Sequence, residues 1–518
     1  MATLKIYART SGMQESIDQI DQLIAEQRKV LEANAVVRNA HEMLAAEERN
    51  QAQSRDLADL LTAKQILLAH MDQEVLARSY AAGRAWLRAE GAKGIKSGGW
   101  KWTSVVLRGG TRLKFETPYI RRSLQGQRGA KRQSRREGGA GLHPVLLWLG
   151  FEERLSPATY SEVARQTVLA GSYDEAREGL ARQGLELDVS TMTSAAVRVG
   201  QKALELRDAS ISAAIEAELP EQSSLAGKRV RISLDGGRTR TRRTRYGRGI
   251  RPGKNGRRPF VREWIEPRVL TIDLLDEQGE VDRSQRPIYG TTLEKADAAM
   301  RMVLGTLRLL GVHLAREVLF VADGTDWIWN RIEKTLLDAG VPAERFTLVL
   351  DYYHATQYID AALSLCKDMR LEARKALFEQ LCRRMLEPGG PEAVIEQLRS
   401  LARGRRAAAI HKELRYLETR LELMRYAEVR ERKLSIGSGV VESAVRRLIN
   451  LRFKAASICW KTEHLAPLLE LRAIAKSGRW DQFFSAQLRH AHYLEPATAF
   501  ASSAGTRRTA SKPRRQAA

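Results

Sequence analysis

Arg229-Val-Arg-Ile-Ser-Leu-Asp235-Gly-Gly-Arg238 predicts a buried β-strand that ends in a carboxylate and a flexible turn. Glu317-Val-Leu-Phe-Val-Ala-Asp323-Gly324 repeats that pattern further along the chain. Gly437-Ser-Gly-Val-Val-Glu442 is a glycine loop that opens a helix, with a carboxylate in its first turns. Two strand-end aspartates and one helical glutamate, contributed by distant segments, are what a divalent-metal phosphoryl-transfer site needs.

The region around these segments alternates strands and helices. We expect strands at 230–234, 260–265, 269–275, near 287–289, and at 318–322 and 346–350, with helices at 293–310 and 327–339. A meander of strands followed by strand–helix–strand resembles the ribonuclease-H-like α/β fold, in which the first strand lies beside the strand that carries the second aspartate. The two carboxylates would then meet at the carboxyl edge of the sheet, where α/β proteins place their chemistry.

Ten cations and no acid separate Asp235 from Phe260. They are Arg238, Arg240, Arg242, Arg243, Arg245, Arg248, Arg251, Lys254, Arg257 and Arg258. Surface loops usually balance their charges, so this stretch favours a phosphate-backbone clamp that positions DNA without reading its sequence.

Changes in composition and helix-breaking glycine and proline residues divide the rest of the chain into regions. Residues 1–90 predict a helical N-terminal arm, either a dimerisation arm or a helical cap on its own domain. Residues 91–140 predict a small hairpin around Gly109-Gly110 and then a basic stretch, which either contacts DNA or is a solvated linker. The cations of that stretch are Arg121, Arg122, Arg128, Lys131, Arg132, Arg135 and Arg136.

Residues 141–222 predict helices, including a helix that starts after Ser172, a turn at 184–188 and a further helix, which is the pattern of a helix-turn-helix DNA reader and also of many helical hairpins. The catalytic core would occupy 223–354 and close with helices in 436–500. A helical insertion would fill 355–435, with its clear break at Pro388-Gly-Gly-Pro391. Residues 501–518 predict a disordered basic tail.

The formal net charge of +24, from 86 lysines and arginines, points to a polyanionic partner such as nucleic acid. No uninterrupted apolar run reaches the roughly 20 residues that membrane spanning requires, and the N-terminus lacks the apolar core of a signal peptide. The three cysteines, Cys366, Cys382 and Cys459, are too few and too scattered for a disulfide framework or a zinc cluster. These features favour a cytoplasmic protein.

Magnesium prefers oxygen ligands, and manganese can replace it. In a two-ion site Asp235 would bridge both ions, Asp323 would hold one and Glu442 the other. Gly236, Gly237 and Gly324 would let backbone and DNA approach closely. Glu442, Arg446 and Asn450 follow i, i+4 spacing on one helix face, so an exposed ion pair between Glu442 and Arg446 is the structural alternative.

Four segments resemble bacterial insertion-sequence transposases of the DDE class, most closely the IS-Kra type, which is related to Mutator-like transposases. They are Ser233-Leu-Asp-Gly-Gly-Arg238, Val321-Ala-Asp-Gly-Thr-Asp-Trp-Ile-Trp-Asn330, Leu350-Asp-Tyr-Tyr-His354 and Ile436-Gly-Ser-Gly-Val-Val-Glu-Ser-Ala-Val-Arg446. The resemblance implies that Asp235, Asp323 and Glu442 are the metal-binding triad. It also implies that Asp351 and His354 form the family's supporting Asp-x-x-His element, although a packing histidine is an equal alternative.

Asp351 also ends an apolar strand and is therefore the main rival of Asp323. The chain has no cysteine before Cys366, which puts in doubt the N-terminal zinc element of related transposases. Trp460 could stack on a DNA end, but core packing is the favoured alternative. Arg446 and Lys454, on and after the closing helix, complete the residues expected to contact DNA.

The resemblance implies an enzyme that hydrolyses phosphodiesters at the ends of an insertion sequence and transfers the freed 3′-hydroxyl ends into target DNA. Its partners would be the double-stranded terminal inverted repeats and target DNA, bound by a homodimer or higher oligomer on the bacterial nucleoid. Two alternatives remain: a ribonuclease-H-like nuclease without strand transfer, and an inactive DNA-binding regulator.

Overall fold

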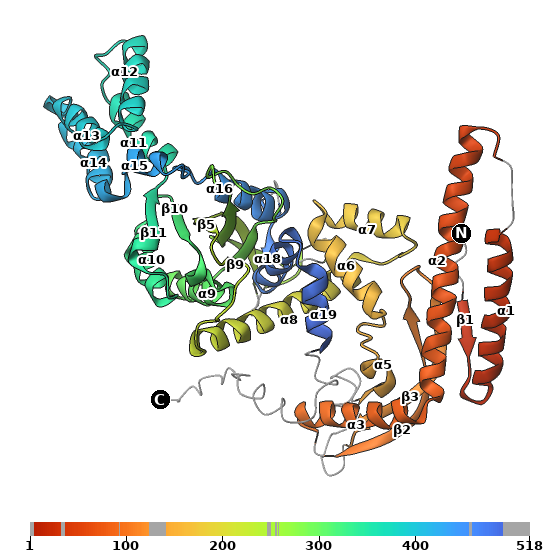
Figure 1. The fold of residues 1–518 in the computed structure, drawn as a ribbon. Helices are drawn as coiled ribbons and strands as arrows, with labels where there is room; N and C mark the ends of the chain where they lie inside the picture. The colour runs from red at the N-terminus through yellow and green to blue at the C-terminus, as the bar shows by residue number, and fades with distance from the viewer. Residues whose placement is uncertain are drawn as a thin grey trace. The chain divides into compact units, whose positions relative to one another are not determined.

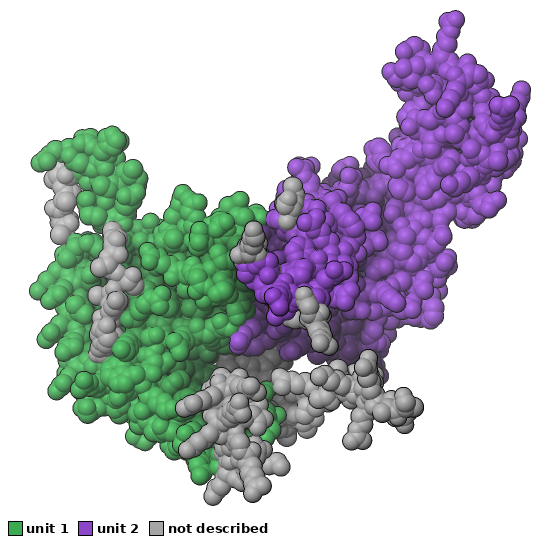
Figure 2. Space-filling model, turned by 180° about the vertical axis from the view of Figure 1, so that it is seen from behind, with its two compact units in different colours: residues 1–196, 481–518 green, residues 197–480 purple. Residues whose placement is uncertain are grey.

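The structure is a computed structural model that describes residues 5–32, 37–92, 94–123, 141–245, 250–253, 256, 258–454 and 458–489. The chain is mixed α/β and forms two compact units, residues 1–196 with 481–518 and residues 197–480 (Figure 2). The predicted basic tail lies outside the described residues. So do several predicted cations, namely Arg128, Lys131, Arg132, Arg135, Arg136, Arg248, Lys254 and Arg257.

The first unit begins with helices packed on a small sheet. Its elements are β1 (Lys5–Ala8), α1 (Met13–Glu32), α2 (Ala40–Met71), α3 (Gln73–Ala89), β2 (Ile95–Val106), β3 (Arg112–Arg122) and β4 (Gly141–Leu142) (Figure 1). Ile20 of α1, Leu67 of α2 and Phe115 of β3 share one buried core. The predicted helices and the predicted hairpin are therefore present, and a dimerisation role for the helical arm stays a prediction. The sequence analysis missed β1, which pairs in parallel with β3.

Further helices of this unit are α5 (Pro144–Trp148), α6 (Pro157–Leu169) and α7 (Tyr173–Arg182), and α8 (Val189–Glu216) begins in it. The Ser172 side chain accepts a hydrogen bond from the Glu175 amide and caps α7, as predicted. The surface between α7 and α8 is acidic, lined by Asp174, Glu175, Glu178, Glu186 and Asp188. This charge is unfavourable for a phosphate backbone, and base reading by these helices stays a prediction.

The second unit is organised around a five-stranded sheet of order β11-β10-β5-β8-β9. The strands are β5 (Arg229–Gly236), β8 (Arg268–Leu275), β9 (Ile288–Thr292), β10 (Glu317–Ala322) and β11 (Phe346–Leu350). Central β5 pairs antiparallel with β8 and parallel with β10, which in turn pairs parallel with β11. The expected adjacency of the two aspartate-bearing strands is confirmed, with Leu234 opposite Ala322.

The two faces of this sheet bury different cores. Val230, Ile232 and Leu234 pack with helices α9 (Ala296–Leu310) and α10 (Asp326–Asp338). Leu319 and Val321 of β10 point the other way and pack with the helical insertion. Because strand side chains alternate between faces, the odd-numbered residues of β5, including Asp235, lie on the insertion side.

The predicted insertion is helical. It comprises α11 (Tyr352–Ser364), α12 (Leu371–Arg384), α13 (Gly390–Ser400), α14 (Ala407–Glu418) and α15 (Tyr426–Glu431), with short 3₁₀ turns η4 (Gly404–Arg406) and η5 (Leu421–Leu423). The predicted break falls between α12 and α13, where Gly389 adopts a φ of 63°. Buried Leu363, Leu381, Leu398 and Leu414 share a core with the sheet, so the insertion is part of the same unit.

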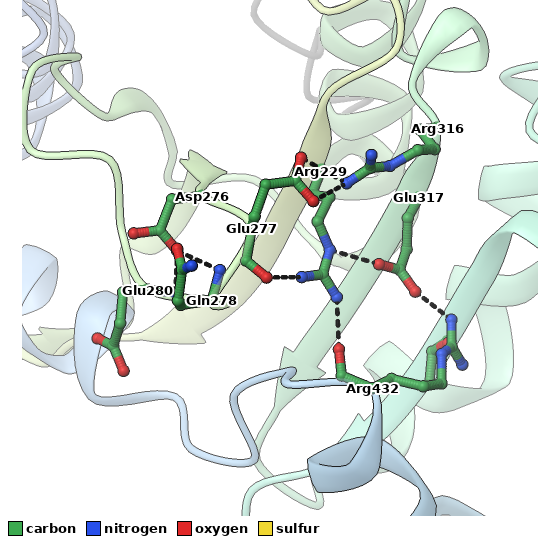
Figure 3. A network of polar contacts seen from close by, with 9 residues as sticks. Arg229, Asp276, Glu277, Gln278, Glu280, Arg316, Glu317 and Arg432 are labelled. Atoms are coloured by element: carbon green, nitrogen blue, oxygen red, sulfur yellow. Dashed lines mark hydrogen bonds and ion pairs between the residues drawn. The ribbon is translucent and has the colours of Figure 1, made fainter.

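A polar network around buried Arg229 connects the end of the insertion to the amino ends of the strands (Figure 3). The Arg229 Nε lies 2.6 Å from Glu317 Oε2, and its Nη2 donates to the Arg432 carbonyl at 2.7 Å. Arg432 in turn pairs with Glu317 and donates to Thr347 Oγ1. Arg316 closes the network by pairing with Glu277 at 2.8 Å. The segment that leads from the insertion to the last helices is thus anchored before it reaches the other end of the sheet.

A second, three-stranded sheet of order β12-β6-β7 follows β5. Its strands are β6 (Thr239–Thr244), β7 (Phe260–Ile265) and β12 (Trp460–Lys461). The sequence analysis placed no strand between Asp235 and Phe260 and missed β6, in which threonines and arginines alternate. Thr239 and Thr241 are buried while the arginines between them face outward. Trp460 is buried against Phe453, which confirms core packing for this tryptophan.

The chain closes with α16 (Gly439–Val445), a π-helical turn η6 (Arg446–Asn450), α17 (Leu451–Phe453), α18 (Thr462–Lys476) and α19 (Trp480–Arg489). No helix within the described ranges is long and apolar enough to cross a membrane.

Candidate active site

The two predicted aspartates lie at the carboxyl ends of adjacent parallel strands. Asp235 is the penultimate residue of β5, and Asp323 directly follows β10. The register that sets Leu234 opposite Ala322 makes the next residue of each strand a neighbour. The Gly236 amide donates to Asp235 Oδ1 at 2.6 Å, which fixes the orientation of this carboxylate.

Helix α16, which carries Glu442, packs against β5 and β8. The approach depends on Gly237, since a Cβ there would lie 2.4 Å from Ile449 Cδ1 and 3.2 Å from Val445 Cγ1. Glu442 is exposed, and no ion pair joins it to Arg446, although both residues are described. The surface-salt-bridge alternative for Glu442 is therefore not realised.

The electrostatics of Asp235 link all three carboxylates. The pKa of Asp235 is raised from 3.8 to about 6, chiefly by burial, with smaller contributions from the negative charges of Asp323, Glu266 and Glu442 and against the lowering effect of the Gly236 amide. Such effects require each of these three acids to lie within electrostatic reach of Asp235. The predicted residues Asp323 and Glu442, together with Glu266, thus act electrostatically on Asp235.

Glu266 is a fourth acid that the sequence analysis missed. It lies between β7 and β8, and a Cβ on Gly236 would sit 2.3 Å from Glu266 Oε1. The available signal was Glu-Pro directly before the strand that pairs with β5, since antiparallel pairing returns that residue to the carboxyl end.

One oxygen of the Asp323 carboxylate is held by the turn that follows it. Its Oδ1 accepts from the Thr325 hydroxyl at 2.6 Å and from the Thr325 amide at 3.2 Å. The Trp329 indole donates to the Asp323 carbonyl at 2.6 Å, which anchors the backbone of the turn. Oδ2 remains available to another ligand.

Asp351, the alternative second aspartate, connects the start of α11 to the loop that precedes α16. Its Oδ1 accepts from the amides of Tyr353 and His354 at 2.7 and 3.3 Å and caps α11. Its Oδ2 accepts from both the amide and the hydroxyl of Ser438. The Tyr352 amide adds a bond to the Ile436 carbonyl at 2.9 Å. Asp351 is 7% exposed and both oxygens are occupied, so it holds the loop that opens α16 at the end of β11.

His354 packs in an aromatic cluster with Tyr358 and Tyr416 of the insertion. Its ring centroid lies 5.8 Å from Tyr358 and 6.0 Å from Tyr416, and the two tyrosine rings stack at 3.5 Å. A Cβ on Gly324 would lie 1.7 Å from Tyr416 Oη. The geometry therefore matches the packing alternative for His354, and a contact with DNA stays untested.

The glycines after the aspartates serve the protein's own packing. Gly236 makes room for Glu266, Gly237 for the helix of Glu442, and Gly324 for Tyr416. The sequence analysis expected these glycines to let DNA approach, but the space beside each of them is filled by the protein's own side chains. The reason is that each strand end is crossed by another segment of the same unit.

The closing helix departs from the expected regular spacing. A π-helical turn occupies Arg446–Asn450, so Asn450 does not continue the i, i+4 row from Glu442. π-helical turns of this kind occur frequently at functional sites. Arg446, the first residue of this turn, and Lys454, which follows it, are both exposed, and their contact with DNA stays a prediction.

The predicted basic clamp divides between two faces of the β6–β7 hairpin. Arg240 and Arg242 lie on one face, and Arg243 lies on the other, where it pairs with Glu263 at 3.2 Å. Arg238 and Arg245, at the two ends of β6, are exposed. The sequence analysis treated all of these arginines as one uniform clamp, and the alternation of β6 is why it was wrong in this respect.

The chemistry of the donor set fits a hard divalent cation, because carboxylate oxygens are the ligands that such ions prefer and the cluster repels itself without one. Among the described residues, however, no three Asp, Glu, His or Cys side chains stand as ligands of a single ion. The acids are thus grouped within electrostatic reach and are not arranged as a closed coordination shell.

No protein-family model matches the sequence, and no curated protein matches it either. Among solved structures, the chain is similar to one described as "Drosophila P element transposase strand transfer complex", with 11% identity and a TM-score of 0.22. The match covers 67% of this chain and 85% of that chain. A likeness of this size carries no argument about the chain's activity.

Proposed function

We propose that the chain is a DNA transposase of the DDE class with a ribonuclease-H-like catalytic core. The proposal rests above all on one observation: the charges of Asp323 and Glu442, which come from two distant segments, both raise the pKa of Asp235 at the end of β5. The sheet order, with a three-strand meander followed by two parallel strands, supports the same fold assignment. The IS-Kra type remains the resemblance from which the residue roles are taken.

Asp235, Asp323 and Glu442 would hold two magnesium or manganese ions. Such ions stabilise negative charge on the attacking and leaving oxygens of an in-line phosphoryl transfer. The protein's own contribution is placement. Asp351 and Ser438 fix the start of α16, and Thr325 fixes the Asp323 carboxylate, so that the elements carrying the acids are held in place.

The substrate would be double-stranded DNA, held near Asp235 by the exposed arginines of β6 and by Arg446 and Lys454. The net charge of +24 supports a polyanionic substrate. Assembly of two DNA ends by a homodimer or higher oligomer is part of the proposal, as is activity on the bacterial nucleoid.

The decisive experiment uses DNA whose ends match the inverted repeats that flank the reading frame. With Mg²⁺, the wild-type protein should nick these ends and should also join pre-cleaved ends to a target plasmid. Cutting without joining would favour the ribonuclease-H-like nuclease, and binding without either reaction would favour the regulator.

Asp323→Asn keeps the shape of the side chain and loses a charged ligand, so it should abolish both reactions. Asp297→Asn, an exposed aspartate on α9, is the matched control and should keep both. Full strand transfer by Asp323→Asn would reject the assignment of the triad.

A further inference from the structure

One face of the β6–β7 hairpin combines cations with exposed aromatic rings. In the antiparallel pair Arg240 lies opposite Trp264, Arg242 opposite Arg262, and Thr244 opposite Phe260. Alternation along each strand puts these residues on the same face, away from buried Thr239 and Thr241. We call it the arginine–aromatic face, formed by Arg238, Arg240, Arg242, Phe260, Arg262 and Trp264.

The aromatic rings of this face are open to solvent. Trp264 is 58% exposed and Phe260 is 38% exposed, whereas Trp460 of neighbouring β12 is 6% exposed. The same small sheet therefore buries one tryptophan in a core and leaves another outside. Exposing large aromatic rings to water is unfavourable, so we infer that Trp264 and Phe260 bind a partner and do not serve internal packing.

Arginines flank both rings. The guanidinium carbons of Arg238 and Arg240 lie 5.5 and 5.7 Å from the Trp264 ring centroid. Those of Arg242 and Arg262 both lie 5.8 Å from the Phe260 centroid. Rings and guanidinium groups alternate across the face, and either can stack on a nucleobase.

The charge of the face is not balanced from within. Arg242 and Arg262 are directly opposed like charges, an arrangement that destabilises a strand pair. Glu263, the acid of β7, points to the other face and pairs with Arg243. Arg238, Arg242 and Arg262 form no ion pair with a carboxylate of the described chain. A polyanion would relieve this repulsion.

We propose that the arginine–aromatic face binds unpaired nucleotides of a DNA strand beside the cleavage site. Arginines alone would suffice for the phosphates of duplex DNA, whose bases are stacked on one another and closed to protein rings. Exposed rings interleaved with arginines instead match single-stranded DNA, whose bases offer free faces. Arg238 is three residues from Asp235, so the bound nucleotides would lie next to the acidic cluster. The placement of the nucleotides beside a cleavage site rests on the proposed function. The binding of single-stranded DNA by this face does not depend on it.

The test measures binding without catalysis. Fluorescence anisotropy would follow a labelled oligothymidylate and a blunt duplex of equal length, with Asp235→Asn protein and EDTA present. Trp264→Ala should weaken oligothymidylate binding by about fivefold or more, which is the lower end of the loss of one base–aromatic stack. Duplex binding should change little. Trp264→Tyr should restore single-strand affinity, which would show that the ring and not the fold is responsible.

Salt titrations separate the two chemistries of the face. Trp264→Ala removes no cation and should leave the slope of log affinity against log salt unchanged. Arg242→Gln and Arg262→Gln should each lower the single-strand slope by about 0.7 for a lost phosphate contact. Lys334→Gln, which removes an exposed cation from α10, should change neither slope nor affinity.

The proposal fails if Trp264→Ala and Phe260→Ala weaken both DNA forms equally or neither. It also fails if these variants turn an oligomer into a monomer with unchanged DNA affinity, because the face would then join copies of the chain. Failure of the proposed transposase activity would look different: single-strand binding would persist while no DNA was cut or joined.

Discussion

Replacing Asp235 by asparagine should stabilise the metal-free protein, although it removes the central residue of the proposed site. The raised pKa means that the folded state resists ionisation of this carboxyl. Below pH 3.8 both states are protonated and nothing is lost. As pH rises through about 6, the folded state must accept a charge that the unfolded state accepts more readily. Stability associated with Asp235 is therefore lost upward in pH.

The size of the effect follows from the shift. A difference from 3.8 to about 6 corresponds to up to ~3 kcal/mol at ~1.36 kcal/mol for each pKa unit. Asparagine keeps the acceptor for the Gly236 amide and cannot ionise. The advantage of Asp235→Asn should therefore be small near pH 4 and approach this value above pH 7.

Urea unfolding of the full chain, followed by hydrogen exchange of the β5 and β10 amides, would measure the difference at several pH values. Asp297→Asn is the control, and its exposed ion pair with Arg331 should make it nearly neutral at every pH. Mg²⁺ should stabilise the wild type and have little effect on Asp235→Asn. An Asp235→Asn protein that is no more stable than wild type at pH 7.5, with no pH dependence in the difference, would mean that the acids do not share one site.

Three other changes probe the supporting structure. Asp351→Asn should destabilise the second unit by ~2–3 kcal/mol, because the asparagine NH₂ group and the Ser438 N–H would then be two donors facing each other. A lower unfolding midpoint and faster hydrogen exchange in α16 would show this loss. No loss of stability would instead return Asp351 to the list of metal ligands. Burial lowers the pKa of His70 from 6.5 to about 4, so the first unit should lose up to ~3 kcal/mol of its unfolding free energy as pH falls through this range. His70→Gln should remove this pH dependence, which hydrogen exchange of the α2 amides would measure. Gly324→Ala should cost ~1–3 kcal/mol through its clash with Tyr416, whereas equal stability of variant and wild type would disprove the close approach.

Local patterns were enough for most elements of the second unit. The apolar runs that end in Asp235 and Asp323 predicted β5 and β10 to within a residue or two, and β7 and β11 had the expected bounds. The glycine loop before Glu442 did open a helix. These features depend on neighbours in the chain, which the sequence lists directly.

Other features depend on segments that meet only in the folded chain. The sequence analysis missed β6 because the ten cations of this stretch obscured the alternation of its threonines. These threonines are buried by Phe453 and by strand β12, which lie far along the chain. Glu266 joins the acids because β8 runs back along β5.

The sequence by itself determined that this is a basic chain with an α/β core, and which acids stand at strand ends. It left Asp323 and Asp351 as rivals, since both follow apolar strands. The tertiary structure distinguishes them by their hydrogen bonds: the amide and the hydroxyl of Ser438 both donate to Asp351 Oδ2, whereas Thr325 donates to Asp323 Oδ1. The choice of Asp323 as the metal ligand stays a prediction. Hydrogen bonds between residues 87 positions apart are set by packing and cannot be inferred from local pattern.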